Sequence, residues 1–221
     1  MGTGVVSWPQ LLSLSRILAA VPVAALIFRG DSTSYLIAAA LFAVASLTDL
    51  LDGPLARRGQ TVGPLGIYLD TTADKVLVSV VLVGLSAVHL VDAWMTMVIV
   101  AREFLVLGIR TLAGAQGFVV SPNLAGKVKA FVTMAAIVIV LLWAAAEQGG
   151  FGMSGSALNT ARSVAWSAMA LATVLTLWSG IQYLVDARPL YSGGAARGSS
   201  TSRASTQSEA RSAAGGVEPP H

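Results

Sequence analysis

Six long apolar stretches dominate this 221-residue sequence and limit what the chain can fold into. Each is about 17 to 25 residues long, the length that a helix needs to cross a hydrocarbon layer of about 30 Å. The stretches run from Leu11 to Phe28, Tyr35 to Asp52, Asp70 to Ala87, Ala93 to Ala113, Leu124 to Ala146 and Ala161 to Val185. Because a segment inside a bilayer must satisfy its own backbone polar groups, the pattern predicts an all-α polytopic membrane protein with six transmembrane helices.

The charge content favours a membrane location over a soluble one. Charged residues make up only 11% of the chain, whereas soluble domains carry about 25%. The 14 lysines and arginines exceed the 11 acidic residues by a net charge of only +3, so no nucleic-acid partner is indicated. The chain has no cysteine, which excludes a thiol nucleophile, an iron–sulfur cluster and a cysteine zinc site.

Two regions differ in composition. Residues 1–191 hold the apolar stretches and are expected to form the membrane domain. Residues 192–221 consist mainly of small and polar residues, which bury too little apolar surface to fold, so we expect a disordered tail. Trp8 and Pro9 favour an N-terminal interfacial segment along the cytoplasmic surface. Arg16 interrupts the first apolar stretch, which is therefore expected to remain as a span rather than to be removed as a signal.

Basic residues predict which side of the membrane the connections face. Arg57 follows the second apolar stretch, and the link between the fourth and fifth is bounded by Arg110, Lys127 and Lys129. Positively charged connections tend to stay in the cytoplasm. We therefore expect a multi-pass protein of the plasma (inner) membrane with both termini and these two connections on the cytoplasmic side.

Four aspartates lie where the second apolar stretch ends and the third begins. Asp49 and Asp52 are three residues apart, and Asp70 and Asp74 are four apart. At these spacings the two members of a pair lie on one face of a helix. Two such faces, one ending a helix and one beginning the next, can point at each other.

Carboxylates gathered in a low-dielectric setting repel one another and need positive charge nearby. Arg57 can neutralise one of them, and the others favour hard divalent cations with oxygen ligands, Mg²⁺ or Mn²⁺. Two such ions suit displacement at phosphorus. Gly53, Ala56 and Gly66 lack bulk and would let a large phosphorylated ligand lie against the backbone. Pro54 is expected to end or bend the second helix.

Two other interpretations compete with a metal site. The aspartates could cap helix ends, which is the ordinary role of a single acidic residue there. Four of them at helical spacing, with an arginine and small residues between, favour a site instead. Intramembrane carboxylates also occur in cation transporters, but a transporter would need charges near the midplane of several spans.

The same residues resemble the signature of the CDP-alcohol phosphotransferase family, D-x-x-D-G-x-x-A-R-x8-G-x3-D-x3-D. Every spacing is intact, with the signature carried by Asp49, Asp52, Gly53, Ala56, Arg57, Gly66, Asp70 and Asp74. The resemblance implies a six-span enzyme that binds a CDP-linked lipid through two divalent metals, Mg²⁺ or Mn²⁺. Such an enzyme passes the phosphatidyl group to an alcohol and releases CMP. A homodimer is also implied.

The resemblance further implies roles for the signature residues. The four aspartates, Asp49, Asp52, Asp70 and Asp74, would hold the metals, and Asp74 would also take the proton from the attacking hydroxyl group. The cytidine diphosphate would be contacted by Gly53, Ala56, Arg57 and Gly66.

The segments around residues 102–113 and 126–129 resemble the phosphatidylglycerophosphate synthase branch, which implies CDP-diacylglycerol as donor and glycerol-3-phosphate as acceptor. The acceptor phosphate needs fixed cations, for which the candidates are Arg102, Arg110, Lys127 and Lys129. Anchoring of the protein at the cytoplasmic surface is the competing role for the last three. Arg102 and Glu103 lie deeper and are expected to pair or to line the cavity. Inositol phosphate, serine or phosphatidylglycerol remain alternative acceptors.

Overall fold

The computed structural model describes residues 8–56, 64–115, 124–186 and 188, with side chains over 14–48, 72–114, 126, 128–186 and 188. Over these ranges the chain is all-helical, with six helices and no strand. The helices are α1 (Trp8–Arg29), α2 (Ser32–Ala56), α3 (Pro64–Ala87), α4 (Ala93–Ala115), α5 (Leu124–Glu147) and α6 (Ser156–Asp186).

Each predicted apolar stretch corresponds to one helix, and every helix is longer than its stretch. Pro64 begins α3, six residues before the predicted span, because a proline at the first helical position needs no N–H partner. Pro54 is predicted to end or bend the second helix, and α2 extends to Ala56, two residues beyond it. An apolar run marks the part of a helix that lies in apolar surroundings, and the helix can extend beyond that part.

Two of the described helical segments are long and apolar enough to cross a membrane, Val128–Glu147 and Ser156–Asp186. Ser32–Thr48 forms a shorter apolar helical segment. The all-helical class is therefore confirmed for the described residues, and six bilayer crossings stay a prediction.

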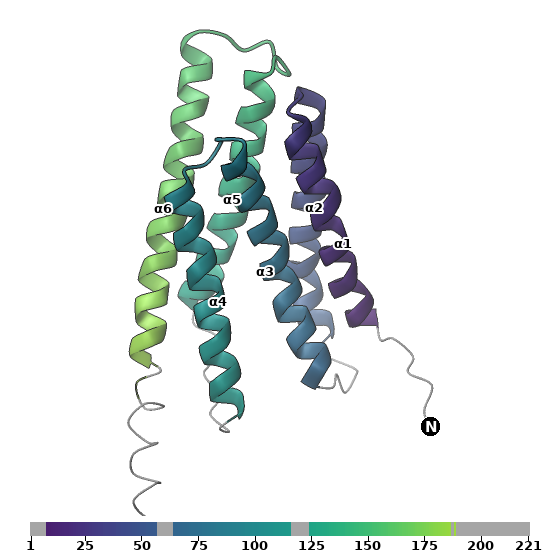
Figure 1. Ribbon diagram of the computed structural model, residues 1–221, viewed down its shortest axis with the longest axis vertical. Coiled ribbons are helices and arrows are strands. Elements are labelled where there is room, and N and C mark those ends of the chain that lie inside the picture. The colour runs from purple at the N-terminus through teal and green to yellow at the C-terminus, as the bar shows by residue number, and fades with distance from the viewer. Residues whose placement is uncertain (1–7, 57–63, 116–123, 187, 189–221) are drawn as a thin grey trace, which may run out of the picture.

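The six helices lie alongside one another and alternate in direction (Figure 1). The connections at 30–31, 88–92 and 148–155 lie at one end of the bundle, which we call the upper end as in Figure 1. The lower end holds the start of α1, the end of α6, and the ends of α2 and α4 that precede α3 and α5. The signature residues Asp49, Asp52, Gly66 and Asp70 therefore fall toward the lower ends of α2 and α3.

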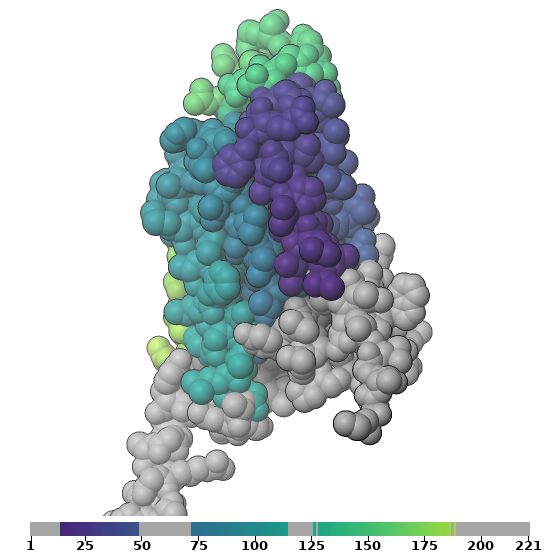
Figure 2. Space-filling view, turned by 45° about the vertical axis from the view of Figure 1, so that its right-hand side comes forward, coloured from purple at the N-terminus to yellow at the C-terminus, as the bar shows by residue number. Residues whose placement is uncertain are grey.

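The helix contacts form a ring in which sequence neighbours are not always spatial neighbours. α1 packs against α2 and α3, α4 packs between α3 and α6, and α5 packs against α2 and α6. Figure 2 shows the face on which α1 lies in front, flanked by α2 on one side and by α3 and α4 on the other. The ring brings α3, α4 and α5 close enough to share a pocket. Within the ring α4 packs mainly on α3 and α6, and α5 packs mainly on α2 and α6.

Apolar side chains face both inward and outward. Phe42, Leu82 and Ile137 are fully buried between helices, whereas Val44 and Val174 are more than half exposed. A helix that is apolar on all sides is typical of a membrane span, because its outer face meets lipid. The exposed apolar surface therefore agrees with a membrane protein.

The connection between α1 and α2 is closed by a helix cap. Gly30 adopts φ +74°, a left-handed conformation that glycine reaches without strain. Asp31 then accepts hydrogen bonds from the Ser34 backbone N–H at 3.0 Å and from the Ser34 hydroxyl at 2.6 Å. The hydrogen bond from the Ser34 hydroxyl is the largest of the causes that hold the pKa of Asp31 below its ordinary value of 3.8.

Replacing Asp31 by alanine is expected to lower the melting temperature by about 2 °C near neutral pH, because α2 loses its N-cap. Folding lowers the pKa of Asp31, so the cap is fully stabilising above 3.8 and loses its effect as the pH falls through the folded pKa. Asp31→Asn is the matched control, since its amide oxygen still caps and does not titrate. Thermal melting in detergent from about pH 7 to about pH 3 measures the effect. A difference between wild type and Asp31→Ala that stays constant over this range would contradict it.

Candidate active site

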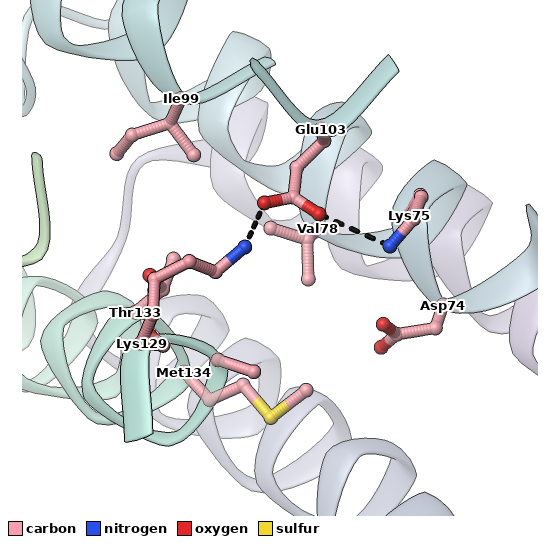
Figure 3. A pocket seen from close by; sticks show the side chains of 9 residues that line it. Asp74, Lys75, Val78, Ile99, Glu103, Lys129, Thr133 and Met134 are labelled. Atoms are coloured by element: carbon pink, nitrogen blue, oxygen red, sulfur yellow. Dashed lines mark hydrogen bonds and ion pairs between the residues drawn. The ribbon is translucent and has the colours of Figure 1, made fainter. Parts of the chain in front are cut away.

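A small pocket between α3, α4 and α5 brings an acidic and a basic set of side chains together (Figure 3). Its volume is about 20 Å³, which is room for about one water molecule. The lining consists of Asp74, Lys75, Val78, Ile99, Glu103, Lys129, Ala130, Thr133 and Met134. The predicted catalytic aspartate thus shares a pocket with charged residues from two other helices.

Glu103 on α4 is the centre of the charged group. Lys75 on α3 donates a hydrogen bond to Glu103 Oε2 at 3.0 Å, and Lys129 on α5 donates one to Oε1. Arg102 Nη1, from the neighbouring position on α4, also donates to Oε1 at 3.2 Å. Glu103 is 7% exposed and Lys129 is 5% exposed. Both oxygens of one buried carboxylate are therefore engaged by cations from three helices.

Arg102 extends this group to a fourth helix. Its Nη2 donates a hydrogen bond of 2.6 Å to the Ser179 hydroxyl on α6. The next residue, Gly180, leaves room for the arginine stem, because an added Cβ would lie 3.0 Å from Arg102 Cγ. Arg102, Glu103, Lys75, Lys129 and Ser179 together form what we call the Glu103 cluster, which links α3, α4, α5 and α6.

The Glu103 cluster holds three cations against one carboxylate, an excess of two positive charges. A charged side chain is costly in an apolar layer unless it is paired, and removing one member of a buried pair leaves an uncompensated charge. Asp74 borders the same pocket and is a further negative charge near this excess. The arrangement is suited to attract and orient an anionic group.

The structure brings some of the predicted site residues together and separates others. Asp74 and Lys129 line the same pocket, and Arg102 pairs with Glu103 as the sequence predicted for a deep charge. Arg110 does not line that pocket: it is exposed on α4, and its guanidinium carbon lies 5.8 Å from the centre of the Tyr183 ring. Of the three predicted acceptor cations whose side chains are described, Arg102, Arg110 and Lys129, only Lys129 lines the pocket with Asp74.

The remaining signature residues other than Arg57 have described backbones, but their side chains are not described. Asp49, Asp52, Gly53 and Ala56 fall in the last turns of α2, and Gly66 and Asp70 fall in the first turns of α3, as their helical spacing requires. The Lys127 side chain and the whole of Arg57 also lie outside the described residues. Among the side chains that are described, no three metal-binding residues come together. Three of the four predicted metal ligands, Asp49, Asp52 and Asp70, therefore have side chains outside the described residues, and Asp74 is the one whose side chain is described.

Two partners in the Glu103 cluster, Lys75 and Ser179, were not predicted from the sequence. A partner for Lys75 could have been predicted, because a lysine inside an apolar stretch requires an opposite charge nearby. The role of Ser179 could not, since a serine in a span is common and its contact with Arg102 joins residues 77 positions apart.

Gly180→Ala is expected to destabilise the protein by about 1 to 3 kcal/mol through overpacking. The added Cβ would press on Arg102 Cγ, and Glu103 and Ser179 already fix the far end of that arginine. Gly108→Ala on α4 is the matched control, because its Cβ would meet nothing within 4 Å. Melting temperatures in detergent compare the two variants, and equal changes in both would show that Arg102 is not held in place.

Comparisons with known proteins point to one family. Residues 6–178 match the family described as CDP-alcohol phosphatidyltransferase. A CDP-diacylglycerol–glycerol-3-phosphate 3-phosphatidyltransferase of Bacillus subtilis is 42% identical over 109 residues, which cover 49% of this chain and 56% of that protein. The enzyme of the same name from Rickettsia bellii is 35% identical over 176 residues, covering 79% of this chain and 92% of that protein.

A relative with a different name matches a longer part of the chain. A cardiolipin synthase (CMP-forming) of Streptomyces coelicolor is 33% identical over 191 residues, covering 84% of this chain and 85% of that protein. The relatives thus agree on the family and differ in the reaction that their names give.

Proposed function

The chain belongs to the CDP-alcohol phosphatidyltransferase family, and we propose that it transfers the phosphatidyl group of CDP-diacylglycerol to glycerol-3-phosphate. The products are phosphatidylglycerophosphate and CMP. Two of the relatives described above carry the name of this reaction, and one of them matches over most of its length.

The observation that carries the choice of acceptor is the positive excess of the Glu103 cluster beside Asp74. Glycerol-3-phosphate brings a phosphate dianion, which an excess of two cations can balance. An ammonium group has three N–H donors, of which Lys129 gives one to Glu103. Because the pocket has the size of one water molecule, a bound acceptor would border it rather than fill it.

In the proposed reaction a hydroxyl oxygen of glycerol-3-phosphate attacks the phosphorus that carries the diacylglycerol. A new phosphorus–oxygen bond forms there, and the bond from the same phosphorus to the oxygen of the departing CMP breaks. Asp74 accepts the proton that the hydroxyl group loses. Its place on the pocket, next to Lys75 and facing Lys129 across it (Figure 3), supports this role.

The carboxylate of Asp74 is a hard oxygen donor of the kind that Mg²⁺ and Mn²⁺ prefer. Together with Asp49, Asp52 and Asp70 it would hold two such ions, whose charge would stabilise the oxygens of the reacting phosphates. The cytidine diphosphate is proposed to lie against Gly53, Ala56, Arg57 and Gly66. The helical backbone at Asp49 and Asp52, and at Asp70 and Asp74, supports one acidic face on each of α2 and α3.

We further propose that all six helices cross the membrane with the lower end in the cytoplasm and that the protein forms a homodimer. The apolar outer surface supports the crossings. The positions of Arg110 and Lys129 toward the lower end support the orientation, because basic residues accumulate on the cytoplasmic side. The water-soluble acceptor and CMP would then enter and leave on that side.

The long match to the cardiolipin synthase supports a second candidate, in which phosphatidylglycerol is the acceptor. This lipid has a phosphodiester with one negative charge and no phosphate dianion. It would interact less strongly with the cations of the Glu103 cluster than a dianion does, which is why we place it second.

Release of CMP from CDP-diacylglycerol is the test that separates the two candidates. The purified enzyme with Mg²⁺ or Mn²⁺ is given glycerol-3-phosphate, inositol phosphate, serine or phosphatidylglycerol in turn. We expect glycerol-3-phosphate to give a kcat/KM at least about 100-fold above serine and phosphatidylglycerol, since a site built for a charged group rejects an analogue that lacks it. Inositol phosphate carries the same phosphate dianion, so its turnover reports how well the site fits the rest of the acceptor. Faster turnover with phosphatidylglycerol would establish the second candidate instead.

Asp74→Asn should lower kcat by at least about 100-fold, because an amide cannot accept the proton of the attacking hydroxyl. Binding of the CDP-lipid should be kept in part, which separates loss of chemistry from loss of the fold. Asp92→Asn is the matched control: it is the same change in an aspartate at the upper end, where Asp92 accepts a hydrogen bond from Trp166. Turnover in Asp74→Asn at the wild-type rate would exclude Asp74 as the base.

A further inference from the structure

We propose that Glu103 is a positioning residue for the acceptor, acting through Lys129 and Lys75 without touching the substrate. This inference rests on the proposed function and adds a residue that the acidic signature does not contain.

Glu103 is poorly suited to contact the acceptor directly. Its Oε1 accepts hydrogen bonds from Lys129 and Arg102, and its Oε2 accepts one from Lys75. It is 7% exposed, and a carboxylate repels a phosphate dianion. Any effect of Glu103 on acceptor binding must therefore pass through the cations that it holds.

The ammonium groups of Lys75 and Lys129 need a negatively charged group that fixes their positions. They come from different helices, α3 and α5, and approach Glu103 from opposite sides of the pocket (Figure 3). Lysine carries its charge on a flexible four-carbon stem, and two like charges in a confined space repel each other. A single carboxylate that binds one ammonium group on each oxygen fixes both at a set separation, beside Asp74.

The contact with Lys75 also bears on Asp74 itself. The two residues are neighbours on α3, where successive side chains project about 100° apart. Tying Lys75 to α4 fixes the rotation of α3 about its axis, and hence the direction in which Asp74 projects. Glu103 thus links the cation that faces the acceptor phosphate to the base that faces the acceptor hydroxyl.

A purely electrostatic role for Glu103 and a positioning role predict opposite changes in acceptor binding when Glu103 loses its charge. Glu103→Gln keeps the size of the side chain and removes its charge, so the excess of the cluster rises from two positive charges to three. If the cluster acted only through its field, a dianionic acceptor would bind more tightly to the variant. If Glu103 positions Lys129 and Lys75, the acceptor binds less tightly.

The experiment measures KM for glycerol-3-phosphate and KM for CDP-diacylglycerol separately in purified protein. For Glu103→Gln we expect the acceptor KM to rise at least about tenfold, with the donor KM changed less than about threefold. Glu103→Asp keeps the charge and should recover part of the loss. Glu147→Gln, the same change at the end of α5, is the matched control and should behave as wild type. An acceptor KM in Glu103→Gln that is unchanged or lower would overturn the proposal.

A double variant keeps the test decisive if Glu103→Gln alone fails to fold. Glu103→Gln combined with Lys129→Met restores the excess of two positive charges and removes Lys129, one of the two cations that donate to Oε1. If Glu103 acts through Lys129, this pair should raise the acceptor KM by no more than about threefold over Lys129→Met alone, because the two losses are not additive. A rise of more than about threefold over Lys129→Met alone would overturn the proposal.

Different results refute the proposed function and the role of Glu103. A wild-type protein that releases CMP with another acceptor and ignores glycerol-3-phosphate refutes the proposed function. A wild-type protein that uses glycerol-3-phosphate, together with an unchanged acceptor KM in Glu103→Gln, refutes the role of Glu103 alone.

Discussion

The buried carboxylate of Glu103 is the interaction on which the arrangement of this bundle depends. In an apolar layer a lone charge is costly, so Lys75, Arg102 and Lys129 are each stable in the interior only because a negative charge is close to them. Each of these cations also fixes a helix. Through Lys75 and Lys129 the carboxylate holds α3 and α5 against α4, and through Arg102 and Ser179 it holds α6. Packing between apolar helices in a membrane is weakly specific, and a polar contact of this kind selects one arrangement.

The same interaction joins the fold to the chemistry. Asp74 lies next to one of the paired lysines and faces the other across a pocket of about 20 Å³. The acidic residues of the signature lie on α2 and α3 toward the lower end, while the cations reach the pocket from α3, α4 and α5. A phosphatidyl transfer needs both halves: carboxylates to bind metal and accept a proton, and cations to receive a phosphorylated acceptor. We propose that the Glu103 cluster provides the second half in a chain with so few charges.

Much of the fold could be predicted from the sequence, since a long apolar run has one stable solution in a bilayer, and all six runs form helices. Helix limits were less predictable, as α3 begins at Pro64 and α2 continues past Pro54. In the site, the spacing of Asp70 and Asp74 followed from helical geometry, and the depth of Arg102 and Glu103 required partners. The identity of those partners did not follow, because Lys75 and Ser179 lie 28 and 77 positions from the residues they bind. Contacts between helices depend on the rotation and tilt of each helix, which local sequence does not encode.

The most direct measurement of the central claim is an experimental structure of the protein with glycerol-3-phosphate bound. Our account predicts the acceptor phosphate within hydrogen-bonding distance of Lys129 Nζ, a hydroxyl group of the acceptor facing the Asp74 carboxylate, and Glu103 still bound to Lys75 and Lys129. A phosphate bound elsewhere, with Lys129 contacting Glu103 alone, would contradict it.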